Sequence, residues 1–521
     1  MLVPKFFSLA PHLTRQQVLR DVAAGMIVGI IAIPLSIALA IASGVSPEKG
    51  LITAVVAGFL ISFLGGSRVQ VGGPTGAFVI LVYGIVREHG YEGLALATLM
   101  AGGFLILMGV LRLGRVIEYI PYPITAGFTS GIAVVIFSQQ LKDFLGLAAG
   151  DLPTEFLGRA EALVRHIGTF NPWSLGLGAL SILVILFWPR IMEKVPGPLV
   201  AIVLGTVLAQ AFGLPVETIG SRFPDLSARI PLPSLPAIRL DSIGALVQPA
   251  FAIALLAAIE SLLSAVVADG MIGSRHRSNM ELVAQGAANI GSVLFGGIPA
   301  TGAIARTAAN IRNGGRTPVA GMVHAVTVLL VMLLFMPYAR LIPMAILAAI
   351  LMMVAVKMGD WHAFRRLWKS TRKDFGLLVL TFGLTVVIDL VAAIQVGVVL
   401  SALLFMKSMS DTSRIHLLAT RAASLAEAVR SEEEEATAAP EGAASDPAAP
   451  AATPHAVQVY EIQGPFFFGV ADRFTSVLMS AEPHVRAIVL RMKHVPYMDA
   501  SALEALASTL AHCRRRHLDL V

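Results

Sequence analysis

Residues 72–81 read GGPTGAFVIL and lie within a strongly apolar part of the chain. Proline removes a backbone donor and glycine weakens a helix, so this stretch interrupts a membrane span. Inside a bilayer, broken backbone is tolerated only where it is buried in protein or lines a cavity. The stretch is therefore either a loop between helices or a break that serves a purpose.

A second stretch, PATGA at 299–303, repeats the Thr-Gly-Ala of residues 75–77. Repeats at a fixed spacing indicate a duplicated structural unit. We place the two halves at 1–213 and 240–410. Two further pairs of segments align in the same order, namely 32–44 with 258–270 and 119–128 with 341–350.

The composition is that of an integral membrane protein. Of 521 residues, 56% are hydrophobic and 14% are charged, whereas soluble domains carry about 25% charged residues. The single cysteine, Cys513, excludes a disulfide framework and a cysteine-based metal site. The basic balance does not indicate nucleic acid, because Lys and Arg mark cytoplasmic loops. We expect the lipid bilayer as a partner, no nucleic acid and no cofactor.

Fourteen segments are expected to cross the membrane region, twelve as full spans and two as half-spans. Inner segments then hold about twice as many Lys and Arg as outer ones, which places both termini in the cytoplasm. Seven segments per half is an odd number, so the second half is inverted. The segments are 22–43, 50–66, 76–86, 93–111, 120–141, 173–189, 197–213, 245–268, 279–296, 302–311, 318–337, 341–358, 375–389 and 391–406.

Inverted repeats with paired short segments are typical of transporters with a midplane site; the alternative is a pair of re-entrant loops that serve packing alone. A helix start offers free N–H groups and a partial positive charge, so two facing starts can bind an anion. We expect short extended pieces within 67–73 and 292–297, before the two half-helices. For Thr75 and Thr301 we favour helix capping over substrate contact.

Few ionisable residues lie within the spans. Arg306 falls just over one turn into the second half-helix, where a cation suits an anionic substrate; the alternatives are a structural ion pair or snorkelling. Glu260 lies in the middle of the eighth segment, and a buried carboxyl favours its neutral form. We expect it to carry a coupling proton, or to bind Na⁺ together with Ser264, and a pair with Arg306 is a further option.

The chain changes character after the last span. Residues 411–455 are rich in Ala, Glu and Pro and predict a linker that is disordered in large part. From 456 onward the pattern becomes α/β, with strands at 456–464, 466–469 and 485–492 and a helix at 500–516.

Together these residues resemble the sulfate permease (SulP) family of anion transporters. The resemblance rests on GGSRVQVGGPTGAF (65–78), AIESLLSAVVADGM (258–271) and TGAIARTAANIRNGGRTPVAG (301–321). It implies a core of spans 1–4 and 8–11, a gate of the remaining spans, and elevator-like transport. Residues 456–521 resemble a partial STAS domain.

The resemblance also implies roles for particular residues. Glu260 matches an acidic position linked to cation coupling, with Ser264 nearby, and a Glu there favours H⁺ over Na⁺. Ser501 matches a phosphoserine position of anti-sigma-factor antagonists, although we favour helix capping for it. The substrate-binding positions are Thr75, Gly76, Ala77, Phe78, Thr301, Gly302, Ala303, Ile304, Ala305 and Arg306.

One departure bears on the substrate. Where many sulfate-type members have Gln and Tyr in the first span, this chain has Leu35 and Leu39. Together with VIEYIP at 116–121, that pattern looks closest to a bacterial dicarboxylate-transporting branch. We therefore predict a homodimeric inner-membrane symporter that moves C4-dicarboxylates such as fumarate or succinate with protons. The alternatives are sulfate or bicarbonate transport coupled to H⁺ or Na⁺, an anion channel or exchanger, and a membrane sensor; an enzyme is not expected.

Overall fold

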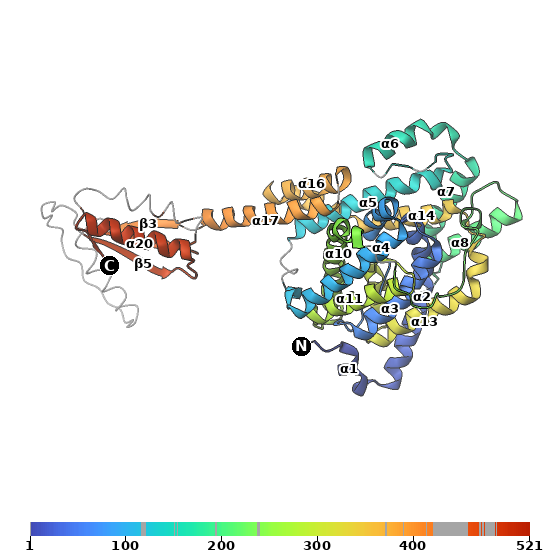
Figure 1. Ribbon diagram of the computed structural model, residues 1–521, viewed down its shortest axis with the longest axis horizontal. Helices are drawn as coiled ribbons and strands as arrows, with labels where there is room; N and C mark the ends of the chain where they lie inside the picture. Colours follow the sequence, from blue (N-terminus) through green and yellow to red (C-terminus); the bar gives the residue numbers. More distant parts are fainter. Residues whose placement is uncertain are drawn as a thin grey trace. The chain divides into compact units, whose positions relative to one another are not determined.

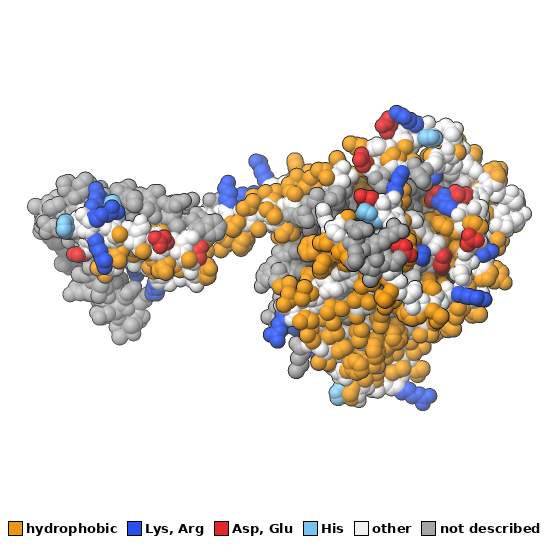
Figure 2. Space-filling model, viewed as in Figure 1, with side chains coloured by type: hydrophobic (Ala, Val, Ile, Leu, Met, Phe, Trp, Pro, Cys, Tyr) orange, Lys and Arg blue, Asp and Glu red, His pale blue; other side chains and the backbone are white. Residues whose placement is uncertain are grey.

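A computed structural model gives the fold (Figure 1). It describes residues 2–115, 121–150, 152–153, 155–192, 195–236, 240–369, 372–388, 390–412, 414–419, 457–467, 470, 474, 485 and 487–521. The chain divides into two compact units, residues 1–398 and 399–521. Eight helices of the described chain are long and apolar enough to span a membrane. Hydrophobic side chains cover much of the visible surface of the helical unit (Figure 2), as lipid contact requires.

Each of the fourteen predicted segments coincides with a helix or with one arm of a helix. The segments at 76–86 and 93–111 join into one element, α4, which breaks at Gly90, where φ is 68°. The helices are α2 (Arg15–Ala42), α3 (Pro47–Leu64), α4 (Phe78–Val110), α5 (Tyr122–Leu145), α7 (Pro172–Ile191), α8 (Gly197–Ala211), α10 (Leu240–Ile272), α11 (Ser278–Leu294), α12 (Ile304–Arg312), α13 (Pro318–Ala339), α14 (Met344–Met358), α16 (Arg372–Val387) and α17 (Leu390–Thr412).

Shorter helices lie before and between these spans: α1 (Lys5–Leu9) before the first, and α6 (Phe156–Arg165), α9 (Ile219–Arg222) and α15 (Trp361–Lys369) between later ones. The long helices form two packed groups. In one, α4 packs on α10 and α11, and α13 packs on α2 and α3. In the other, α5 packs on α14 and α16, and α7 packs on α8 and α14. These groups match the expected core and gate.

Two short strands lie at the centre of the core group. β1 (Gly72–Gly73) pairs antiparallel with β2 (Thr301–Gly302), and Gly72 faces Gly302 in the register. The first extended piece was thus predicted correctly. The second was not, because α11 continues to Leu294 and the strand forms later, at Thr301.

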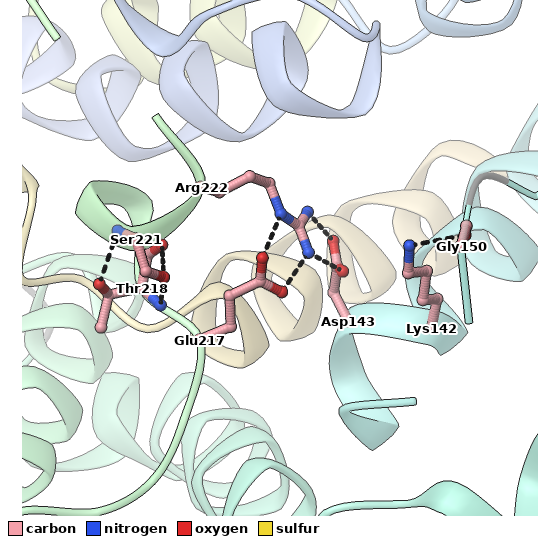
Figure 3. Close-up of polar contacts among 7 residues, drawn as sticks. All are labelled: Lys142, Asp143, Gly150, Glu217, Thr218, Ser221 and Arg222. Atoms are coloured by element: carbon pink, nitrogen blue, oxygen red, sulfur yellow. Dashed lines mark hydrogen bonds and ion pairs between the residues drawn. The ribbon is translucent and has the colours of Figure 1, made fainter. Parts of the chain in front are cut away.

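The loop after α8 is fastened to the end of α5 by an ion cluster (Figure 3). Arg222 of α9 donates to both carboxylate oxygens of Asp143, at 3.0 and 2.7 Å, and its Nε donates to Glu217 at 2.8 Å. Burial alone would lower the pKa of Arg222, but its hydrogen bonds to Glu217 and Asp143 raise the pKa above the ordinary value. Arg222 therefore stays charged, and the cluster stabilises this end of the gate group.

The second unit is an α/β domain. Its sheet has the order β3 (Arg414–Ala419), β4 (Val457–Gln463), β5 (Ala487–His494) and β6 (Asp519–Leu520), with α20 (Ala500–Arg515) between the last two. β3 pairs antiparallel with β4, so residues 414–419 belong to the sheet and not to a linker. The expected strand at 466–469 is reduced to a bridge between Phe466 and Met498. Of the rest of the predicted linker, residues 411 and 412 belong to α17, and residues 413 and 420–455 lie outside the described residues.

Candidate functional site

The site is built where β1 and β2 lead into helices. The chain leaves β1 at Gly73 and β2 at Gly302, and the antiparallel register puts these two exits at opposite ends of the pair. Five residues after Gly73, α4 begins at Phe78; two residues after Gly302, α12 begins at Ile304. No side chain caps the start of either helix. The backbone N–H groups there stay free, and such free N–H groups can bind an anion.

The two threonines do not cap these helices, contrary to the capping prediction. The Thr75 hydroxyl instead donates to Glu260 Oε2 at 2.9 Å. The Thr301 hydroxyl lies 2.5 Å from Ser261 Oγ and donates to the Ala257 carbonyl oxygen at 3.2 Å. Both side chains thus join the half-helix starts to α10, which carries Glu260.

Arg306 is buried, with 3% of its surface exposed. Its Nη1 donates to the Gly72 carbonyl oxygen at 3.2 Å, and its Nη2 donates to the Pro74 carbonyl oxygen. The guanidinium therefore holds β1 and the following turn, so it neither snorkels to the surface nor forms the predicted alternative pair with Glu260. Gly73, at φ 145°, leaves space for it: a Cβ there would lie 2.3 Å from Nη1.

Exposure differs along the predicted binding segments. Gly76, Ala77, Phe78, Thr301, Gly302 and Ala303 are buried, while Thr75 and Glu260 are half-buried. Ile304 is 42% exposed and Ala305 is also exposed. The open positions are thus the first turn of α12 and the Thr75–Glu260 pair.

Ser264 lies one turn after Glu260, but its hydroxyl donates to Thr307 Oγ1 at 3.4 Å. It therefore braces α10 against α12. Sequence reasoning missed Ser261, which accepts a hydrogen bond from the Gly302 N–H at 3.1 Å. It also missed Gln70, whose amide donates to the Ser261 carbonyl oxygen at 3.2 Å. The signal available for Ser261 was its place directly after Glu260.

A buried acidic residue also escaped the sequence analysis. Glu281 of α11 has no exposed surface, and its Oε2 accepts hydrogen bonds from the Gly66 and Ser67 N–H groups. The Gln285 amide donates to its other oxygen at 2.8 Å. These contacts fix the segment that leads into β1.

In the second unit, Ser501 is exposed but does not cap α20. The N-cap is Asp499, whose carboxylate accepts the Ala502 N–H at 2.8 Å. The capping prediction for Ser501 was therefore wrong by two residues.

This fold, with two half-helices that start at a buried strand pair, defines a largely helical, multi-pass membrane transporter with a C-terminal α/β domain. The model of the Sulfate permease family matches residues 18–381, and that of the STAS domain matches residues 448–521. The chain belongs to the sulfate permease (SulP) family; it is a secondary anion transporter and not an enzyme.

Named relatives cover almost the whole chain. "Putative sulfate transporter YvdB" of Bacillus subtilis is 42% identical over 505 residues, which is 96% of this chain and 90% of the relative. The bicarbonate transporter BicA of Picosynechococcus sp. is 31% identical over 503 residues, 94% of this chain and 86% of the relative.

A solved structure agrees in fold. Murine Slc26a9, an anion transporter in the inward-facing state, superposes with a TM-score of 0.84 at 17% identity, over 100% of this chain and 87% of that one. The names of the sequence relatives correct one prediction: they are sulfate and bicarbonate transporters, and the assignment to a dicarboxylate branch is wrong.

Proposed function

We propose that this protein carries a small inorganic oxyanion, with bicarbonate as the first candidate, and couples the anion to a cation at Glu260. The observation that carries the proposal is the contact of Thr75 with Glu260 at 2.9 Å, directly before the uncapped start of α4. An anion at the helix start and a cation at the carboxylate would then share one site. Each would offset the cost of burying the other.

Two features favour bicarbonate over a dianion. Arg306 directs Nη1 and Nη2 to the Gly72 and Pro74 carbonyl oxygens, which occupies two arms of the one buried guanidinium at the described site. Leu35 and Leu39 add no polar group from the first span, and both pack in the apolar core. A singly charged anion needs fewer compensating donors than sulfate does. BicA, a relative over most of the chain, is named as a bicarbonate transporter.

The substrate and the coupling ion are linked by chemistry. A proton carried with bicarbonate is equivalent to CO₂ and water, and CO₂ crosses membranes unaided, so proton symport would accumulate nothing. Bicarbonate therefore requires Na⁺. Oxygen ligands suit a hard cation, and the Glu260 carboxylate with the Thr75 hydroxyl supplies two kinds of oxygen at one place. The second candidate, sulfate with H⁺, follows from the name of YvdB and from the ability of Glu260 to take up a proton.

We further propose an elevator movement in which the group of α2–α4 and α10–α13 carries the site past the other helices. The separate packing of the two groups supports this movement. The homodimer, the inner-membrane location with cytoplasmic termini, and a regulatory role for Ser501 stay predictions.

The test is uptake into proteoliposomes of labelled bicarbonate at alkaline pH, labelled sulfate and labelled fumarate. Each is measured under an inward Na⁺ gradient, an inward H⁺ gradient and no gradient. We expect bicarbonate to accumulate with Na⁺ and fumarate not to accumulate. Accumulation of sulfate with H⁺ alone would establish the second candidate, and no accumulation of any anion would overturn the proposal.

The role of Glu260 is tested with Glu260→Gln, which removes the charge and keeps the shape. We expect accumulation under the cation gradient to be lost. The matched control is Glu161→Gln, because Glu161 is exposed and pairs with Arg165 on α6, away from the site. Accumulation by Glu260→Gln equal to that of the control would remove Glu260 from the coupling.

A further inference from the structure

α15 (Trp361–Lys369) is amphipathic, and one side of it is packed on the helical unit. Ala363 is fully buried and shares a small apolar cluster with Ala126 of α5 and Leu378 of α16; Phe364 and Leu367 pack against the same cluster. The Phe364 ring also meets the Phe382 ring edge to face, with centroids 5.4 Å apart. α15 is therefore fixed to two helices of the gate group.

A three-residue contact orients α15 further. The Tyr122 hydroxyl donates to Asp360, and Arg366 Nη2 donates to the Tyr122 hydroxyl oxygen at 2.7 Å. Asp360 also accepts the Ala363 N–H at 3.2 Å, at the start of the helix. These bonds join Tyr122, the first residue of α5, to Asp360 at the start of α15 and to Arg366 within it. A contact that holds α15 in place therefore also holds the start of α5.

The opposite side of α15 carries cations. Arg365 and Lys369 are four residues apart and therefore point the same way, and both are exposed. Trp368 is 71% exposed, although its ring also meets the Phe375 ring at 4.9 Å. Trp361 is 40% exposed. An exposed Trp beside exposed Arg and Lys, in a segment that the charge distribution predicts to be cytoplasmic, is the pattern of a helix that lies at the headgroup level.

We propose that α15 is a membrane-surface anchor of the gate group, which binds the phosphates of anionic phospholipids through Arg365 and Lys369. Charge complementarity selects the occupant: Arg365 and Lys369 are exposed, no acidic residue occurs in 361–369, and the predicted topology places them at the leaflet that carries negative lipid. The Trp368 ring lies at the boundary between headgroups and acyl chains, where its apolar body and N–H are both accommodated. The anchor holds the gate group at a fixed depth, against which the other helices move.

The test uses the full chain with Trp173 and Trp188 replaced by Phe, so that Trp361 and Trp368 report. Vesicles contain phosphatidylcholine and phosphatidylglycerol, one of which is brominated, and quenching gives the relative affinity for the two lipids at α15. Each exposed cation contributes about fivefold. We therefore expect Arg365→Gln with Lys369→Gln to reduce the preference for phosphatidylglycerol about 30-fold.

The matched control is Arg514→Gln with Arg515→Gln, which removes the same charge from exposed positions of α20. It should keep the lipid preference of the parent chain, and a conservative Arg365→Lys with Lys369→Arg should keep it too. Raised salt should weaken the preference in the parent chain. The proposal is overturned if the parent chain quenches equally with both brominated lipids, or if the double Gln variant keeps the parent preference. Neither result depends on which anion is transported.

Discussion

Arg306→Lys tests whether a guanidinium geometry, rather than a positive charge, maintains the site. Arg306 reaches two carbonyl oxygens at once, those of Gly72 and Pro74. A lysine has one ammonium on a flexible stem and cannot span both acceptors in the fork geometry. One carbonyl is then left without its charged partner inside the protein.

A hydrogen bond to a charged group contributes about 1.5–3 kcal/mol. If that free energy is lost from the transporting state, kcat/KM for anion uptake falls about 10- to 150-fold. Charge at the site is unchanged, so the anion still binds, and the loss should appear in kcat more than in KM. The assay is initial uptake into proteoliposomes over a range of anion concentrations, with protein insertion measured in the same vesicles.

The control is Arg312→Lys, at the exposed end of the same helix. It should transport as the parent chain does. If Arg306→Lys keeps kcat/KM within about twofold of that control, well below the range worked out above, the bridge to Gly72 and Pro74 has no role in transport and the reasoning fails.

Three further outcomes follow from the structure. Gly302→Ala should abolish most uptake, because the new Cβ would lie 1.6 Å from Gln70 Nε2 and displace the Gln70 side chain, which is 3% exposed. The control Gly84→Ala should keep uptake, because no atom lies within 4 Å of a Cβ built there. Uptake of both variants into proteoliposomes checks this. Arg222→Gln should lower the free energy of unfolding by about 1–3 kcal/mol, while Arg165→Gln, in an exposed pair, should change it by less than about 1 kcal/mol, and thermal unfolding of both variants checks the difference. Burial raises the pKa of the Cys513 thiol, so alkylation by iodoacetamide at neutral pH should require denaturant, and mass spectrometry that finds rapid alkylation of the native chain would contradict this.

The sequence was sufficient for the helical segments of the described residues and for the two half-helix starts around which the candidate site is built. Apolar length and the repeated Thr-Gly-Ala carried that information, because a bilayer permits a backbone break only where protein satisfies it. The helix break at Gly90 was also visible, as a gap between two apolar runs.

Local hydrogen-bond partners were not predictable, because they come from segments far apart in the chain. Thr75 looked like a cap, but its partner Glu260 lies 185 residues away. Arg306 was predicted to serve an anionic substrate, yet the acceptors of its hydrogen bonds are carbonyl oxygens of the opposite repeat. β3 lay next to a low-complexity segment, so nothing nearby indicated its pairing with β4.

The branch of the family was misjudged for a related reason. Leu35 and Leu39 pack within the apolar core, so their identity reports on packing as well as on substrate. The branch assignment used these two leucines and the VIEYIP segment, of which residues 116–120 lie outside the described structure. None of these residues belongs to the candidate site, so the assignment did not depend on the site.

The central claim is that the anion binds between the uncapped starts of α4 and α12, beside the Thr75–Glu260 pair. Ala305 is exposed in the first turn of α12, so Ala305→Trp fills the space without disturbing a packed core. Ala211→Trp is the control, at the exposed end of α8. Equilibrium binding of labelled bicarbonate, and of labelled sulfate, to the purified chains measures the site directly. We expect binding of the transported anion to be lost in Ala305→Trp and kept in Ala211→Trp; an unchanged Kd in Ala305→Trp would contradict the placement of the site.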